Sequence, residues 1–218
     1  KMATPYDPIS TSGLAFKYGG TSKALSEMLP FFFNDLSDVI PNVNVANRIV
    51  AAIMKAVRLG EDKFQQEFGG WMPASNQFGI VPLRPCHLGF PDNRWIWTDA
   101  ATSSVFWSGE ESLVNVSSLD SKAIILLYGY FNLEPVPNTL ELFIQPGSTK
   151  FPIWSVVPLR LSKQRYFVLP TPIIIEPLSA IIVKASTQTA AATAEEAGFL
   201  GYYFAPNSRL IDKKLKED

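Results

Sequence analysis

The sequence predicts a mainly β protein, an antiparallel β-sandwich of jelly-roll-like character with an N-terminal arm and a helical element. Between Ser117 and Phe204, short runs rich in β-branched and aromatic residues alternate with breaks that contain proline or glycine. Runs of this length and spacing favour a sandwich or jelly roll over a βαβ sheet. One run, TLELFIQ, also shows the period of two that a half-buried strand requires.

The N-terminal residues predict an arm followed by helices. Residues 1–20 lack a hydrophobic period and indicate an extended arm, and a first helix is expected from Thr21 or Ser22 until Pro30 disturbs it. A second helix is expected after a cap at Asn42 or Asn44 and before a stop at Gly60, with a further turn or two possible before Gly69-Gly70. Its wide apolar stripe predicts burial on more than one side, and is formed by Val45, Ile49, Ile53 and Val57 with their neighbours.

The remainder predicts a long connection and then strands. Residues 71–91 are expected to form the connection, and RWIWT, SSVFW and SLVNV the first β-like runs. PIIIE and AIIVK, joined by Pro177-Leu-Ser, are continuous apolar runs that indicate buried strands, with Ile174 and Ile182 in the core. Thr187 to Ala197 is expected to be a loop or short helical turn before a last strand from Phe199 to Phe204.

The predicted domains are residues 1–70 (arm and helices), 71–211 (sandwich) and 212–218 (charged tail). We expect the helical region to serve assembly more than folding of the sandwich.

The amino-acid composition narrows the classes of function that the protein can have. The chain of 218 residues is 47% hydrophobic and 12% aromatic but only 18% charged, whereas about a quarter is usual. Such a chain is expected to pack against copies of itself or other subunits. The net charge of −1 argues against a dedicated nucleic-acid binder, although a local basic patch stays open. The single cysteine, Cys86, excludes an internal disulfide, and no apolar run reaches the roughly 18 residues of a transmembrane segment. We therefore expect a soluble protein made in a reducing compartment.

Catalytic and metal chemistry find little support. His87 is the only histidine, and its neighbour Cys86 points to the opposite face of an extended chain, so the two do not form a nucleophile and base pair. Phosphate-binding loops and calcium loops are absent from the sequence. We expect no enzyme activity, no catalytic residue, no cofactor and no metal, with His87 a loop or interface residue and Cys86 a small buried one.

The aromatic residues are the predicted interface. Trp95 and Trp97 share a strand face by the period of two, which suits a core, a subunit interface or a flat sugar-binding surface. Core or interface is the favoured interpretation. Three consecutive aromatics at Phe31, Phe32 and Phe33 cannot all enter one small core, so at least one is expected to meet a partner.

The segment LLYGYFNLEPVPNTLELFIQPGSTKFPIWSVVPLRL, followed by RYFVLPTPIIIEPLSAIIVKAS, resembles the jelly-roll or β-sandwich structural proteins of virus particles. The strand lengths, the Gly129 to Phe131 tripeptide and the prolines around Glu176 carry this resemblance. It implies a capsid, vertex or head-accessory subunit, made in the host cytoplasm and located in the virion, whose partners are its own copies and other virion proteins. The alternatives are a carbohydrate-binding or host-attachment module and, third, an enzyme on a sandwich scaffold.

Overall fold

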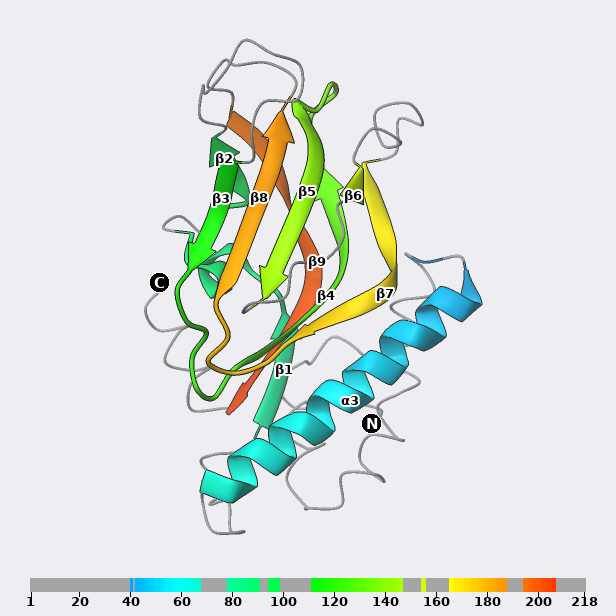
Figure 1. Ribbon diagram of the computed structural model, residues 1–218. Coiled ribbons are helices and arrows are strands. Elements are labelled where there is room, and N and C mark those ends of the chain that lie inside the picture. Colours follow the sequence, from blue (N-terminus) through cyan, green and yellow to red (C-terminus); the bar gives the residue numbers. More distant parts are fainter. Residues whose placement is uncertain are drawn as a thin grey trace, which may run out of the picture.

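The computed structural model describes residues 40, 42–67, 78–90, 94–98, 111–146, 154–155, 165–187 and 194–206. Two antiparallel sheets form a β-sandwich, and one long helix packs on the outside of the first sheet (Figure 1). The expected arm, the first expected helix, the SSVFW run, the Phe31 to Phe33 run and the charged tail lie outside the described residues.

Helix α3 spans Val43–Glu67 and begins at the predicted cap. The Oδ1 atom of Asn42 accepts hydrogen bonds from the backbone N–H groups of Asn44 (3.0 Å) and Val45 (3.4 Å), so Asn42 and not Asn44 is the N-cap. The expected stop at Gly60 was wrong, because the helix continues through it to Glu67. A glycine in a helix interior costs only about 1 kcal/mol, and the good helix formers that follow it sustain the helix.

Over residues 43–60 of α3, where the side chains are described, one face is buried, which corrects the expectation of burial on several sides. The side chains of Ile49, Ile53 and Val57 are fully buried, whereas Arg48 and Lys55 on the opposite face are exposed. The buried face rests on the first sheet, where α3 contacts β7, β4 and β9. The width of the stripe therefore reflects a broad contact with one sheet.

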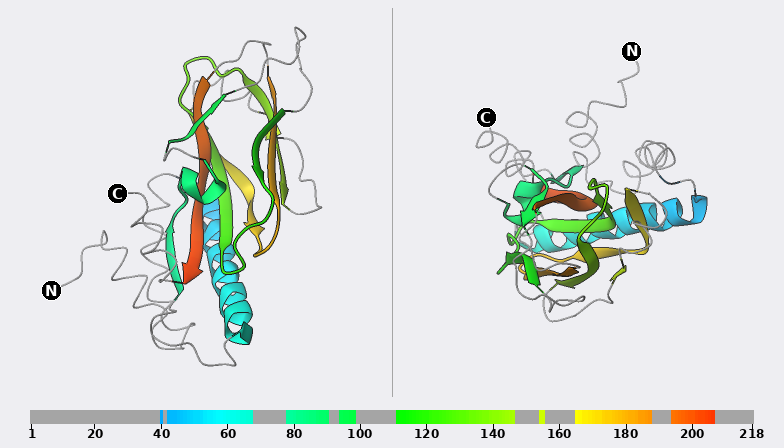
Figure 2. Two further views of the ribbon diagram at one scale, coloured as in Figure 1. Left: turned by 90° about the vertical axis from the view of Figure 1, so that its left-hand side faces the viewer. Right: turned by 90° about the horizontal axis from the view of Figure 1, so that it is seen from above.

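Sheet 1 contains five strands and sheet 2 contains four. In sheet 1, β1 (Phe78–Pro82) and β2 (Ile96–Thr98) pair with the same edge of β9 (Ala194–Pro206), followed by β4 (Ile124–Asn132) and β7 (Tyr166–Ile175). Sheet 2 has the order β3 (Glu111–Val116), β8 (Ile181–Thr187), β5 (Thr139–Pro146) and β6 (Trp154–Ser155). A short 3-10 helix, η2 (Pro85–Leu88), follows β1. Figure 2 shows the two sheets as separate layers.

The strand pairs are nested in the sequence. The innermost pair is β5 with β6, and around it lie β4 with β7, β3 with β8, and β1 with β9, all antiparallel. Successive pairs alternate between the two sheets. The two runs joined by Pro177-Leu-Ser consequently belong to different sheets: β7 lies in sheet 1 and β8 in sheet 2.

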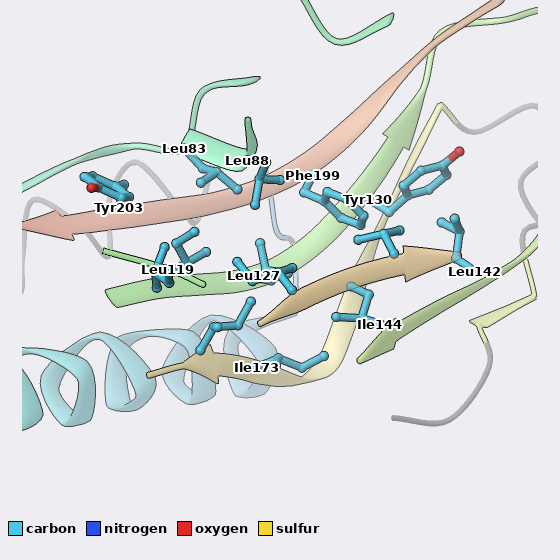
Figure 3. Packing of buried hydrophobic residues seen from close by; sticks show 14 of the residues in the cluster. Leu83, Leu88, Leu119, Leu127, Tyr130, Leu142, Ile144, Ile173, Phe199 and Tyr203 are labelled. Carbon is cyan, nitrogen blue, oxygen red and sulfur yellow. The ribbon is translucent and has the colours of Figure 1, made fainter. Parts of the chain in front are cut away.

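Strand β4, an inner strand of sheet 1, is buried on both faces, which explains its continuous apolar sequence. Ile125 and Leu127 of β4 face the interior of the sandwich, and Ile124 and Leu126 face α3. Figure 3 shows the sandwich interior, where Leu127, Tyr130 and Phe199 from sheet 1 meet Leu142 and Ile144 from sheet 2. The molecule thus has two cores, one between the sheets and one under the helix.

Three strand boundaries differ from the sequence-based expectation. RYFVL and PIIIE form the single strand β7, which continues through Pro170 and Pro172. Those prolines lie in a register shift: Leu127 pairs with Ile173 but Gly129 pairs with Val168. Proline is tolerated there because β7 is an edge strand and the bulged residues donate no ladder hydrogen bond. In addition, β1 and η2 lie within the expected connection of 71–91, and β9 begins at Ala194 within the expected loop.

Candidate functional site

The beginning of β9 meets the β4–β5 connection at one end of the sandwich. Glu195, the second residue of β9, is only 1% exposed, which is rare for a carboxylate. Its backbone pairs with Trp97 of β2. A charge at such a position requires hydrogen-bond partners to offset the loss of hydration.

Four donors converge on the Glu195 carboxylate. Oε1 accepts hydrogen bonds from the backbone N–H groups of Asn138 and Thr139, the latter at 3.1 Å. Oε2 accepts one from the Thr139 hydroxyl at 2.6 Å and one from Asn132 Nδ2 at 3.2 Å. A carboxylate offers about four lone-pair sites, so these contacts use its accepting capacity. We call these four hydrogen bonds the Glu195 clasp. They join sheet 1 to the first residue of β5 in sheet 2.

A second set of bonds fixes the backbone of the β4–β5 connection against β9. Asn132 Oδ1 accepts from the Glu134 N–H at 3.0 Å, and Asn132 Nδ2 donates also to the Tyr130 hydroxyl at 3.1 Å. The Leu133 N–H donates to the Glu196 carbonyl at 2.8 Å, and the Glu196 N–H donates to Glu134 Oε1 at 3.3 Å. The connection is therefore held at both of its ends.

Exposed apolar side chains lie around this clasp. We call Ile96, Leu133, Val136 and Tyr166 the apolar rim; their side chains are 43%, 36%, 66% and 41% exposed. Ile96 pairs with Glu196, whose carbonyl binds Leu133, and Tyr166 pairs with Phe131 at the end of β4. Ile96 lies on β2, Tyr166 lies on β7, and Leu133 and Val136 lie in the β4–β5 connection, so the rim extends over the width of β2, β9, β4 and β7, roughly 14 Å. Exposed apolar groups on a rigid support suit a contact with another protein surface.

Trp95, part of the predicted interface, is half-buried and packs on the sandwich core. Its ring makes edge contacts with Phe90, Phe131 and Phe199, with centroid distances of 5.7, 6.1 and 6.5 Å. Gly198 lies directly against the ring, since a Cβ added there would be 2.4 Å from Trp95 Cδ2. Trp97 is placed by its backbone in β2. The interface roles of these two residues and of Phe31 to Phe33 remain predictions.

His87 and Cys86 occupy η2, beside β9. His87 is buried, its ring stacks on Tyr203 at a centroid distance of 4.0 Å, and its Nδ1 accepts a hydrogen bond from the Arg84 N–H at 3.0 Å. Cys86 is partly buried. The imidazole thus fixes the backbone that begins η2. Within the described part of the chain, no group of three or more His, Cys, Asp or Glu side chains is placed to hold a metal ion.

Tyr128 and Tyr202 form a pair between sheet 1 and α3. Their ring centroids are 5.7 Å apart, and both side chains pack against the core under the helix. Tyr128 is the extra residue of a bulge between Leu127 and Gly129. Burial raises the pKa of the Tyr128 phenol, and its hydrogen bond with Tyr202 opposes this in part.

Sequence reasoning missed Glu195 and the apolar rim. The one available signal for the rim was Val136 between two prolines in a turn segment, where a branched apolar residue has no core to enter. Glu195 gave none, because its partners are more than fifty residues away in the sequence.

No helix among the described residues has the length and apolar character that spanning a bilayer demands.

Comparison with models of protein families gives no match, and neither does comparison with curated protein sequences. Among solved structures, the chain is similar to the crystal structure of the infectious bursal disease virus VP2 subviral particle, with 13% sequence identity and a TM-score of 0.31. The alignment covers 62% of this chain and 34% of the VP2 chain, so the chain spans about a third of that protein's length.

Proposed function

We propose that this chain is a structural subunit of a virus particle, a capsid, vertex or head-accessory protein built on a jelly roll. The nested strand pairing carries the proposal. The innermost pair is β5–β6 and successive pairs fall in alternate sheets, which is the arrangement expected of a jelly roll and therefore supports this part of the proposal. That architecture is a common one for viral capsid domains.

The fold alone does not choose the function, because lectins and cupins also use jelly rolls. Low charge favours the structural role, since only 18% of the residues are charged. The apolar rim supports it as well, because Leu133 and Val136 lie in the connection that the Glu195 clasp holds at its ends and Ile96 and Tyr166 lie on paired strands, so little ordering is needed when a partner binds. A carbohydrate-binding role is less well supported: the Trp95 ring packs on Gly198 and three phenylalanines instead of standing free.

In this proposal the apolar rim contacts copies of the chain or other virion proteins, with Trp97 and Phe31 to Phe33 as further contact residues. The protein is made in the host cytoplasm and resides in the virion. It acts through these contacts, without catalysis and without a cofactor. Closed symmetry is the expected outcome, as in most assemblies of identical subunits.

Light scattering after size-exclusion chromatography, with electron microscopy of the same fractions, tests the proposal. The purified chain is expected to form closed oligomers or shells. Val136→Glu should shift the distribution toward smaller species, because it places a charge in the contact. Leu178→Asp is the matched control: Leu178 is 68% exposed but lies in the β7–β8 connection at the opposite end. A monomer at every accessible concentration, with no partner among virion proteins, would refute the structural role.

A further inference from the structure

The exposed face of α3 carries only positive charge over most of its length. Between Asn42 and Gly60 the charged residues are Arg48, Lys55 and Arg58, and the sequence holds no Asp or Glu there. All three side chains are exposed. We call Arg48, Lys55 and Arg58 the basic stripe.

Helix geometry aligns the three residues. At 100° per residue, Lys55 lies about 20° and Arg58 about 80° around the axis from Arg48. At 1.5 Å per residue, the stripe is about 15 Å long. It therefore forms a row of cations that runs along the helix and turns by about 80° around its axis, on the side away from the buried Ile49, Ile53 and Val57.

Neighbouring side chains leave donors of the basic stripe able to bind a ligand. Among the residues whose side chains the structure describes, no acidic side chain pairs with Lys55 or Arg58. Glu61 and Asp62 follow Arg58 by three and four residues and bound the stripe at its C-terminal end. Arg48 uses Nη1 to donate to the Pro170 carbonyl at 3.0 Å, and the other guanidinium donors of such a group can still bind. The row ends at Glu61 and Asp62, and Lys63, which follows them, is paired with Glu176 at an Nζ to Oε2 distance of 2.7 Å.

We propose that the basic stripe binds nucleic acid through the phosphate backbone, without reading base sequence. Charge complementarity supports this partner: a linear polyanion presents phosphates along a line, as the stripe presents cations, and arginine forms forked hydrogen bonds to phosphate. An anionic membrane fits less well, because a membrane-surface helix needs apolar side chains to insert and those of α3 are buried under sheet 1. The overall net charge of −1 is compatible with the proposal, since the charge is local.

Fluorescence anisotropy with a labelled single-stranded RNA of mixed sequence tests it on the full chain. Three phosphate contacts predict a log–log salt slope of about −2, so binding should weaken about 18-fold between 50 and 200 mM salt. In the double variant Lys55→Gln/Arg58→Gln, one contact remains, and the slope should fall to about −0.7. Lys55→Arg/Arg58→Lys keeps both charges and should retain binding.

Lys184→Gln on β8 provides the matched control. Its neighbours Val183 and Ala185 face the sandwich interior, so Lys184 projects from the outer face of sheet 2, away from α3. This variant should bind RNA with unchanged slope. Circular dichroism confirms that each variant keeps its helix content. The proposal is overturned if the chain does not bind RNA at 50 mM salt, if the double variant binds as the unmodified chain does, or if the chain binds vesicles containing phosphatidylserine but not RNA. It does not depend on assembly, since a monomer carries the whole stripe.

Discussion

Glu195 of β9 and Thr139 of β5 join the two sheets through two hydrogen bonds. The Glu195 carboxylate accepts one from the backbone N–H of Thr139 and the other from its hydroxyl. Replacing Glu195 with Ala removes one acceptor from each of these donors and from those of Asn132 and Asn138. We expect a loss of about 3–5 kcal/mol in the free energy of unfolding, measured by urea denaturation. Glu134→Gln, which alters one long bond at the surface of the same connection, should cost less than about 1 kcal/mol. Equal stability of the two variants would contradict the clasp.

Gly198 should be intolerant of even one methyl group. A Cβ there would lie 2.4 Å from the Trp95 ring, so Gly198→Ala must displace the tryptophan. The expected cost is about 1–3 kcal/mol, with a change in tryptophan fluorescence. Trp95→Phe combined with Gly198→Ala should be less destabilising than the sum of the single changes, because the smaller ring relieves the clash. Additive effects would show that the ring does not lie on Gly198.

Adjacent isoleucines of β8 should respond differently to a carboxylate. Ile181 is fully buried between the sheets, whereas Ile182 is only half-buried on the outer face of sheet 2. Ile181→Asp buries an unpaired polar group and should cost several kcal/mol or prevent cooperative unfolding, and Ile182→Asp should cost clearly less. Thermal unfolding followed by circular dichroism decides between them. The reverse order would mean that the register of β8 is shifted by one residue.

Helix α3 should contribute to folding as well as to binding. Ile53→Ala opens a cavity under the helix and should cost about 2–5 kcal/mol, against about 0.5–1.5 kcal/mol for Ile53→Val. A chain that begins at Trp71 lacks α3 and exposes Ile124, Leu126 and Phe204, so we expect it to be insoluble or unfolded. A soluble, folded monomer from that truncation would instead support the sequence-based expectation that the helices serve assembly.

Alkaline pH should weaken the fold through Tyr128. Its pKa is raised in the folded state by burial, so above the ordinary tyrosine pKa of about 10 the unfolded chain loses a proton that the folded chain keeps. This contribution to stability is complete below about pH 10 and declines as the pH rises toward the folded-state pKa. Tyr128→Phe should flatten the decline in urea denaturation curves measured above pH 10. An unchanged slope would place the alkaline sensitivity elsewhere.

The strands that local pattern could predict are those whose apolar residues form uninterrupted or alternating runs. β4, β5 and β8 are of this kind. β1 was missed because FGIVP contains a glycine and a proline, and its pairing with β9 compensates for both. The start of β9 was missed because alanine and glutamate have low β propensity, and here the clasp and the pairing with β2 override it.

The hydrogen-bonded site around Glu195 could not be predicted from local sequence pattern. Asn132, Asn138, Thr139 and Glu195 are ordinary polar residues in the sequence, and only the folded path of the chain brings them together. A tryptophan beside a strand predicts packing of some kind. Trp95 packs on the sandwich core of its own subunit, and the interface role of the aromatic residues stays a prediction.

The nested pairing also determines when the fold can be completed. Phe78 pairs with Pro206, and more than half of the 218 residues lie between them, whereas β5 and β6 are the paired strands that lie closest in sequence among the described residues. Pairings of such high contact order fold slowly, because the loop entropy is lost before the contacts form. During synthesis, the pairing of β1 with β9, and of one edge of β4 with β9, must wait until residues 194–206 have left the ribosome. Newly made chains therefore pass through an aggregation-prone state, and expression at low temperature or with chaperones should raise the yield of folded protein.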